Sequence, residues 1–177
     1  MKTTQILIAG FGGQGVLFAG KFLAYNGLVQ DKQVSWLPSY GPEMRGGTAN
    51  CSVILSDTPV GSPIITNPDV LIAMNLPSLQ KFVDDVVPGG HIILDSTLID
   101  MKVERGDVQV HYVPATQMAK DAGFASLANM ILAGKALAVA DCVDFADNAG
   151  TLQSFIPAKK ANLIEANCQA LQLGYDY

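Results

Sequence analysis

The segment that most constrains the fold runs from Ile6 to Gly15, where a short apolar stretch ends in a cluster of glycines. An apolar strand that leads into a glycine-rich turn and then a helix is how α/β proteins bring backbone N–H groups close to a phosphate. Gly10, Gly12 and Gly15 have the G-x-G-x-x-G spacing of dinucleotide-binding turns. The segment therefore predicts a Rossmann-like domain, and it raises the question of whether this turn binds a dinucleotide.

Strand-like and helix-like segments alternate along the whole chain, which predicts one three-layer α/β domain over residues 1–177, with a mostly parallel sheet and helices on both faces. We see no repeat and no linker that would divide the chain. Gly27 and Gly174 are interpreted as stop signals at helix ends. The expected strands are 6–9, 33–37, 48–55, 70–74, 91–95 and 108–113, and the expected helices are 13–28, 77–86, 114–122, 127–141 and 158–173.

The carboxylate that a dinucleotide site requires is missing from the expected position. In Rossmann domains an acid at the end of the second strand, about 20 residues beyond the glycines, binds the ribose hydroxyls. Here the second expected strand ends at Leu37, and Pro38 and Ser39 follow it. Three interpretations stay open: a stand-alone nucleotide-binding protein, a turn whose bare N–H groups face an anion or a partner, and a tight structural turn without a ligand.

A second loop, from Tyr40 to Gly47, is broken by glycine and proline and carries Glu43 and Arg45 on either side of Met44. Only 15% of the chain is charged, against about a quarter in an average domain, so these charges are interpreted as placed contacts. A solvated turn is the alternative. We expect the strand before this loop to neighbour the first strand, which would put both loops at one edge of the sheet.

Composition narrows the classes of function. The chain is 49% hydrophobic, which indicates a surface buried against a partner, and no stretch of about 18 apolar residues predicts a membrane span. The first residues do not have the charged and apolar pattern of a secretory signal peptide, so we expect a cytoplasmic protein. The net charge of −5 and the absence of a basic cluster argue against a nucleic-acid partner. Three cysteines without C-x-x-C and only two histidines argue against a metal or iron–sulfur site.

The two loops together carry a family resemblance. Gly10-Phe11-Gly12-Gly13-Gln14-Gly15 followed by Ser39-Tyr40-Gly41-Pro42-Glu43-Met44-Arg45-Gly46-Gly47 resembles the gamma subunits of 2-oxoacid:ferredoxin (or acceptor) oxidoreductases. The resemblance extends over nearly the whole chain, as a pyruvate/ketoisovalerate oxidoreductase gamma-type domain, and includes Asn129-Met130. The form of the second loop looks most like the 2-oxoglutarate branch (2-oxoglutarate synthase), with the branched-chain and pyruvate enzymes as alternatives.

The resemblance implies a subunit that is required for an enzyme but is not catalytic alone. Such enzymes oxidatively decarboxylate a 2-oxoacid, form an acyl-CoA from the substrate CoA, and pass electrons to ferredoxin or a similar acceptor. Thiamine diphosphate and Mg²⁺ would be held by alpha and beta subunits, and iron–sulfur clusters by beta or delta subunits. The chain alone is then expected to bind no cofactor.

The resemblance and the bare amides together suggest which residues form the site. We expect no catalytic residue and no metal ligand in this chain, because no standard catalytic set is present. The expected cofactor-binding residues, near CoA phosphates or thiamine diphosphate, are Gly10, Gly12, Gly13, Gln14, Gly15 and Arg45. The expected subunit contacts are Tyr40, Glu43 and Met44. A purely structural scaffold with both loops buried in an interface is the alternative.

Overall fold

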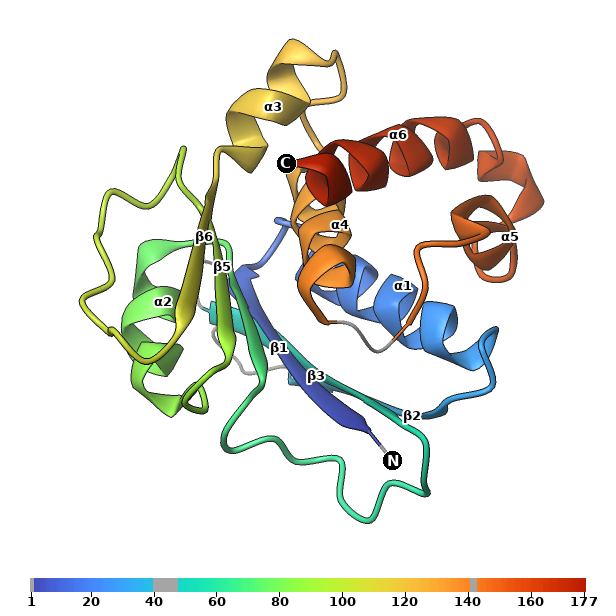
Figure 1. The fold of residues 1–177 in the computed structure, drawn as a ribbon. Coiled ribbons are helices and arrows are strands. Elements are labelled where there is room, and N and C mark those ends of the chain that lie inside the picture. The colour runs from blue at the N-terminus through green and yellow to red at the C-terminus, as the bar shows by residue number, and fades with distance from the viewer. Residues whose placement is uncertain (1, 40–47, 141–142) are drawn as a thin grey trace.

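A six-stranded sheet lies between two layers of helix in the computed structural model, which describes residues 2–39, 48–140 and 143–177 (Figure 1). The strand order is β2-β3-β1-β4-β5-β6. The strands are β1 (Thr3–Phe11), β2 (Gln33–Ser39), β3 (Thr48–Ser56), β4 (Val70–Ala73), β5 (His91–Asp95) and β6 (Gln109–Val113). The helices are α1 (Val16–Leu28), α2 (Leu76–Phe82), α3 (Ala115–Asp121), α4 (Ala128–Ala140), α5 (Asn148–Gln153) and α6 (Leu163–Asp176), with 3₁₀ turns η1 (Val83–Asp85) and η2 (Ala158–Lys160).

The sheet is mostly parallel, as predicted. β1, β4, β5 and β6 pair in parallel, and among the described strands β3 alone runs opposite to the other five. The expectation that β2 neighbours β1 is wrong, because β3 lies between them. Residues 40–47 are too few for a parallel crossover, which needs a dozen or more residues, so β3 pairs with β2 in antiparallel fashion. β3 also pairs with β1 along its other edge, which places it between the two strands.

Two hydrophobic cores cover the two faces of the sheet, because successive residues of a strand point to opposite sides. Ile6 and Ile8 of β1 belong to the larger core, which α1, α4 and α6 complete. Leu7 belongs to the smaller core on the other face, together with Leu79 of α2. Figure 1 shows α2 on one side of the sheet and α1, α4 and α6 on the other. The prediction of helices on both faces is therefore confirmed.

Two glycines bring α4 and α6 into backbone contact. A Cβ atom on Gly134 would overlap the carbonyl of Leu171, and one on Gly174 would overlap the carbonyl of Ile131. The interpretation of Gly174 as a stop signal is wrong, because it lies inside α6, where the close approach requires the absence of a side chain. Gly27 likewise lies inside α1, where it packs against β3 rather than ending the helix.

The helices otherwise differ from expectation mainly at their ends. The expected helix 158–173 is a 3₁₀ turn followed by α6, and the expected helix 77–86 is α2 followed by η1. The short helix α5 was not predicted; its N-cap Asp147 accepts a hydrogen bond from the Gly150 N–H at 3.0 Å. Within the described residues, no helix is long and apolar enough to cross a membrane.

Candidate functional site

The glycine turn, residues 12–15, connects the carboxyl end of β1 to the start of α1. Gly13 and Gly15 have φ angles of 91° and 79°, a left-handed conformation that glycine adopts far more readily than other residues. The Gln14 N–H donates to the Phe11 carbonyl at 3.2 Å, which closes the turn. The predicted strand, turn and helix are therefore present in the predicted order.

The turn leaves backbone donors unused. Within the described residues, no atom accepts a hydrogen bond from the N–H groups of Gly12, Gly13 or Gly15. α1 also begins without a capping side chain, so the N–H groups of its first turn have no partner within the helix. These donors lie at the N-terminus of α1, the positive end of the helix dipole, an arrangement that suits a phosphate or a carboxylate.

Gln14 is engaged within the fold rather than free. Its Oε1 accepts the Phe11 N–H at 2.6 Å, and its Nε2 donates to the Met74 carbonyl at 3.0 Å. The side chain therefore links the end of β1 to the end of β4. Gly10 makes room for it, since a Cβ atom there would lie 2.7 Å from the Gln14 Oε1.

Asn129, near the start of α4, holds the turn from the other side. Its Nδ2 donates to the Gly15 carbonyl at 3.1 Å, and its Oδ1 is buried without a partner among the described residues. The same is true of the Asn75 Nδ2 and the Ser78 Oγ, just beyond β4. Residue type and spacing gave no signal for Asn129, which lies 114 positions from Gly15; only the family resemblance pointed to it.

A cavity of about 280 Å³ opens beside the turn. None of the described residues that line it is charged: Phe11, Gly12, Gly13, Gly15, Val16, Leu17, Phe18 and Ala49. Tyr40, Glu43, Met44 and Arg45 lie outside the described residues. The end of β2 and the start of β3 flank these residues. Both lie at this edge of the sheet, because Thr48 of β3 pairs with Phe11 of β1, and Ser39 of β2 pairs with Asn50 of β3.

The geometry lacks the ribose contact of a dinucleotide site. β3 separates β1 from β2, so the end of β2 lies two strand spacings, about 10 Å, from the end of β1. Residues at the end of β2 are Leu37, Pro38 and Ser39, none of which can act as the ribose-binding acid.

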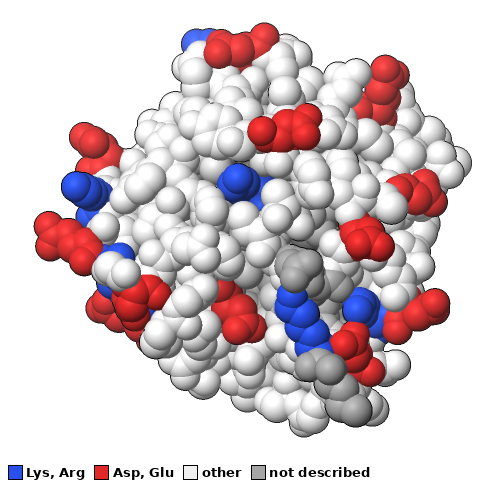
Figure 2. Space-filling model, in the orientation of Figure 1, with Lys and Arg blue, Asp and Glu red and all other residues white. Residues whose placement is uncertain are grey.

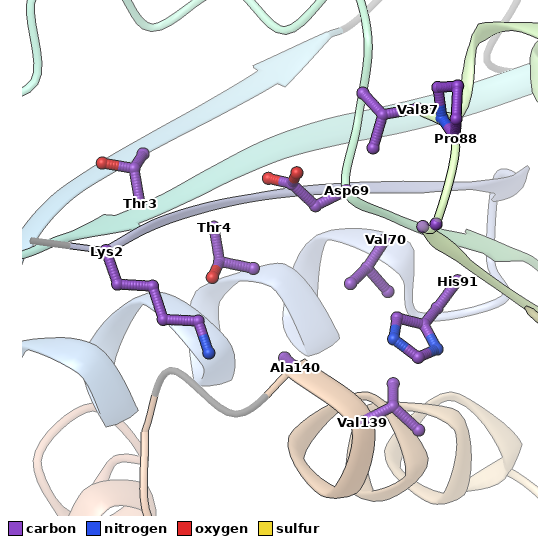
Figure 3. Close-up of a pocket in the computed structure, with 12 residues that line it drawn as sticks. Lys2, Thr3, Thr4, Asp69, Val70, Val87, Pro88, His91, Val139 and Ala140 are labelled. Atoms are coloured by element: carbon purple, nitrogen blue, oxygen red, sulfur yellow. The ribbon is translucent and has the colours of Figure 1, made fainter. Parts of the chain in front are cut away.

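A second cavity, of about 380 Å³, lies at the opposite, amino-terminal edge of the strands (Figure 3). Its ionisable groups are engaged: the Asp69 Oδ2 accepts the Gln5 N–H at 2.7 Å, and the His91 Nδ1 lies 3.1 Å from the His111 Nε2. Burial and the charge of Lys135 lower the pKa of both histidines, that of His111 to about 4. The pair is therefore neutral at pH 7, and no group of three or more metal-ligating side chains occurs in the described ranges.

On the face that Figure 2 shows, blue and red side chains lie next to one another along the left border and at the lower right, and a largely uncharged area with a few charged groups lies between them. Only 15% of the chain is charged, which is less than in an average domain, so uncharged side chains make up much of this surface.

Comparisons with known proteins agree with the fold. The family described as "Pyruvate ferredoxin/flavodoxin oxidoreductase" matches residues 5–177. The ketoisovalerate oxidoreductase subunit VorA of Methanothermobacter thermautotrophicus is 40% identical over 98% of this chain, but the match covers 36% of VorA. The chain thus spans about a third of that relative's length.

Two further relatives match over more of their own length. The 2-oxoglutarate synthase subunit KorC of Methanothermobacter marburgensis is 37% identical over 73% of this chain and 74% of its own. The solved structure of a keto/oxoacid ferredoxin oxidoreductase gamma subunit from Geobacter sulfurreducens superposes with a TM-score of 0.83, at 30% identity, over 98% of this chain and 96% of that one.

Proposed function

Because the chain belongs to the pyruvate ferredoxin/flavodoxin oxidoreductase family, we propose that it acts as the gamma subunit of a 2-oxoacid:ferredoxin (acceptor) oxidoreductase. The similarity to a solved gamma subunit over nearly the full length of both chains supports this role. The observation that carries the proposal is the row of N–H donors in the glycine turn that are unused within the described residues, beside a cavity whose described lining carries no charge. In this role the chain completes a site whose bond-breaking groups belong to other parts of the enzyme.

The glycine turn binds an anionic group in this proposal. The N–H groups of Gly12, Gly13 and Gly15 donate to a phosphate of CoA or of thiamine diphosphate, and Arg45 adds a positive charge from the neighbouring loop. Hydrogen bonds to a charged group contribute about 1.5–3 kcal/mol each, so the loss of one such contact is measurable as a change in KM. Gly10 and Gln14 shape the turn instead of contacting the ligand.

The partners proposed are the alpha, beta and delta subunits of the same enzyme, with Tyr40, Glu43 and Met44 as contacts. Those subunits hold thiamine diphosphate, Mg²⁺ and the iron–sulfur clusters, and ferredoxin or a similar acceptor reaches the complex in the cytoplasm. When bound there, thiamine diphosphate supplies the decarboxylation chemistry, and CoA takes up the acyl group. This chain positions the anionic end of CoA and keeps water from that side.

The proposed 2-oxoacid is 2-oxoglutarate, which is supported by the form of the 40–47 loop and by the KorC relative. A branched-chain oxoacid is the second candidate, because the VorA relative has the higher identity, over more of this chain. Turnover of the assembled enzyme with 2-oxoglutarate, ketoisovalerate and pyruvate at equal concentration distinguishes these candidates. Preference for 2-oxoglutarate by more than about tenfold in kcat/KM, or about 1.4 kcal/mol, supports the first.

A carboxylate introduced into the turn tests the anion site. Gly12→Glu should raise the KM for CoA in the assembled enzyme about tenfold, since it places a negative charge beside the bound phosphate. Gly61→Glu is the matched control, because Gly61 has open space around it and lies in the loop after β3. Normal assembly with an unchanged KM for CoA would contradict the site. Failed assembly of Gly12→Glu alone would favour a structural role within an interface.

A further inference from the structure

The point between β1 and β4 is where an open α/β sheet normally binds its ligand. These two strands are parallel neighbours, and the helices that follow them leave on opposite faces: α1 on one side and α2 on the other (Figure 1). The connections therefore diverge at the carboxyl edge and leave a crevice between the strand ends. In dinucleotide-binding proteins the pyrophosphate lies in this crevice.

Here a side chain of the protein occupies that crevice. The Gln14 carboxamide spans it, with the Phe11 N–H bonded at 2.6 Å on the β1 side and the Met74 carbonyl bonded at 3.0 Å on the β4 side. Its Oε1 lies over Gly10, in the space that a side chain at that position would fill. The Phe11 N–H and the space beside Gly10 are thus taken by the Gln14 side chain.

The residues whose N–H groups stay unused line a cavity on the β3 side of the turn. The N–H groups of Gly12, Gly13 and Gly15 have no acceptor in the described ranges, and all three residues line the 280 Å³ cavity next to Ala49 of β3. A ligand can therefore reach the turn from the β3 side. The β1–β4 crevice is closed to it.

We propose that Gln14 is a specificity-determining residue, whose carboxamide excludes a dinucleotide pyrophosphate from the crevice between β1 and β4 and leaves the glycine turn accessible only from the β3 side. The proposal rests on the glycine turn being a binding edge, as the proposed function requires. It explains how a turn with dinucleotide-type spacing serves a different ligand without a change in backbone path.

Two variants separate the volume of the side chain from its hydrogen bonds. Gln14→Ala empties the crevice and releases the Phe11 N–H, whereas Gln14→Met keeps a side chain of similar size without the amide. Inorganic pyrophosphate is the probe, titrated calorimetrically into the purified protein. We expect Gln14→Ala to bind it at least tenfold more tightly than the wild type, and Gln14→Met to bind it no more tightly than the wild type.

Hydrogen exchange gives a second readout that does not depend on the probe. The Phe11 amide should exchange slowly in the wild type and much faster in both variants, because its acceptor is gone. Wild-type binding of pyrophosphate as tight as that of Gln14→Ala would overturn the proposal. So would the absence of any gain in a folded Gln14→Ala, or an equal gain in Gln14→Met. If Gln14→Ala does not fold, Gln14→Ser takes its place, since its hydroxyl is too short to reach both strand ends.

These outcomes are distinguishable from those for the proposed function. If the turn binds the diphosphate of CoA or of thiamine diphosphate, the wild type has some affinity for pyrophosphate from the β3 side, and the gain in Gln14→Ala is measured relative to that affinity. If Gly12→Glu left the KM for CoA unchanged, this result would contradict the proposed CoA site. A gain of pyrophosphate binding in Gln14→Ala would still support the role of Gln14. Conversely, if Gln14→Ala bound pyrophosphate no more tightly than the wild type, this result would contradict the exclusion of pyrophosphate by Gln14. The result for the KM of CoA would not be affected.

Discussion

Replacement of Gly15 by alanine tests how firmly the glycine turn is held between α1 and α4. Gly15 has φ 79°, and a Cβ atom there would meet the Asn129 carboxamide, with its Cγ only 2.8 Å away. Alanine at this position must adopt a left-handed conformation and push the amide aside. The amide would then lose its hydrogen bond to the Gly15 carbonyl, which is 3.1 Å long in the wild type.

The expected cost follows from these two contributions. The left-handed conformation costs alanine about 1 kcal/mol. A buried amide that loses its partner costs about 1–3 kcal/mol more, and the Asn129 Oδ1 is already without one. We therefore expect Gly15→Ala to lower the free energy of unfolding by about 2–4 kcal/mol.

Urea denaturation of four variants measures the two contributions separately. Gly13→Ala is the matched control, because Gly13 has φ 91° but nothing within 4 Å of a Cβ atom, so only the conformational cost of about 1 kcal/mol applies. In the pair Gly15→Ala and Asn129→Ala, the double variant should be less destabilised than the sum of the single variants by about 1–2 kcal/mol. Equal costs at Gly13 and Gly15, or strict additivity, would refute the reasoning.

Two further predictions concern parts of the fold away from the turn. Gly134→Ala should destabilise the protein by about 1–3 kcal/mol, because its methyl overlaps the Leu171 carbonyl, whereas Gly106→Ala, in open space, should change urea stability little. Burial lowers the pKa of His111 from 6.5 to about 4. Between these pH values the unfolded chain therefore binds more protons than the folded chain does. The free energy of unfolding should then fall by about 1–2 kcal/mol as the pH drops through this range. His111→Gln should lose this part of the pH dependence, and an unchanged slope would contradict the assignment.

The fold class was predictable because the signals for it are local. Apolar stretches such as 6–9 and 91–95 are short and bounded by turn residues, and the helical segments between them alternate regularly, so layers and a mostly parallel sheet follow. The position of β3 between β1 and β2 was not predicted, although the sequence carried a signal for the antiparallel pairing of β3 with β2. The eight residues between β2 and β3 are too few for a crossover, and that length alone indicates an antiparallel pair.

The roles that sequence reasoning missed depend on contacts distant along the chain. Gly27 and Gly174 stand near helix ends, and only the packing of α1 on β3 and of α6 on α4 shows that they are interior residues. Gln14 was correctly placed in the turn, but its bond to the Met74 carbonyl, 60 residues away, could not be predicted from spacing. The same holds for Asn129 and its bond to Gly15.

The central claim is that the glycine turn and the edge around it bind against the rest of a 2-oxoacid oxidoreductase. Hydrogen exchange of the protein, free and in the assembled enzyme with CoA, tests it most directly at the unused amides of Gly12, Gly13 and Gly15. We predict that these amides become protected by at least tenfold, while those of Gly89 and Gly90 at the opposite edge do not change. Protection at the opposite edge alone, or none at the turn, would contradict the account.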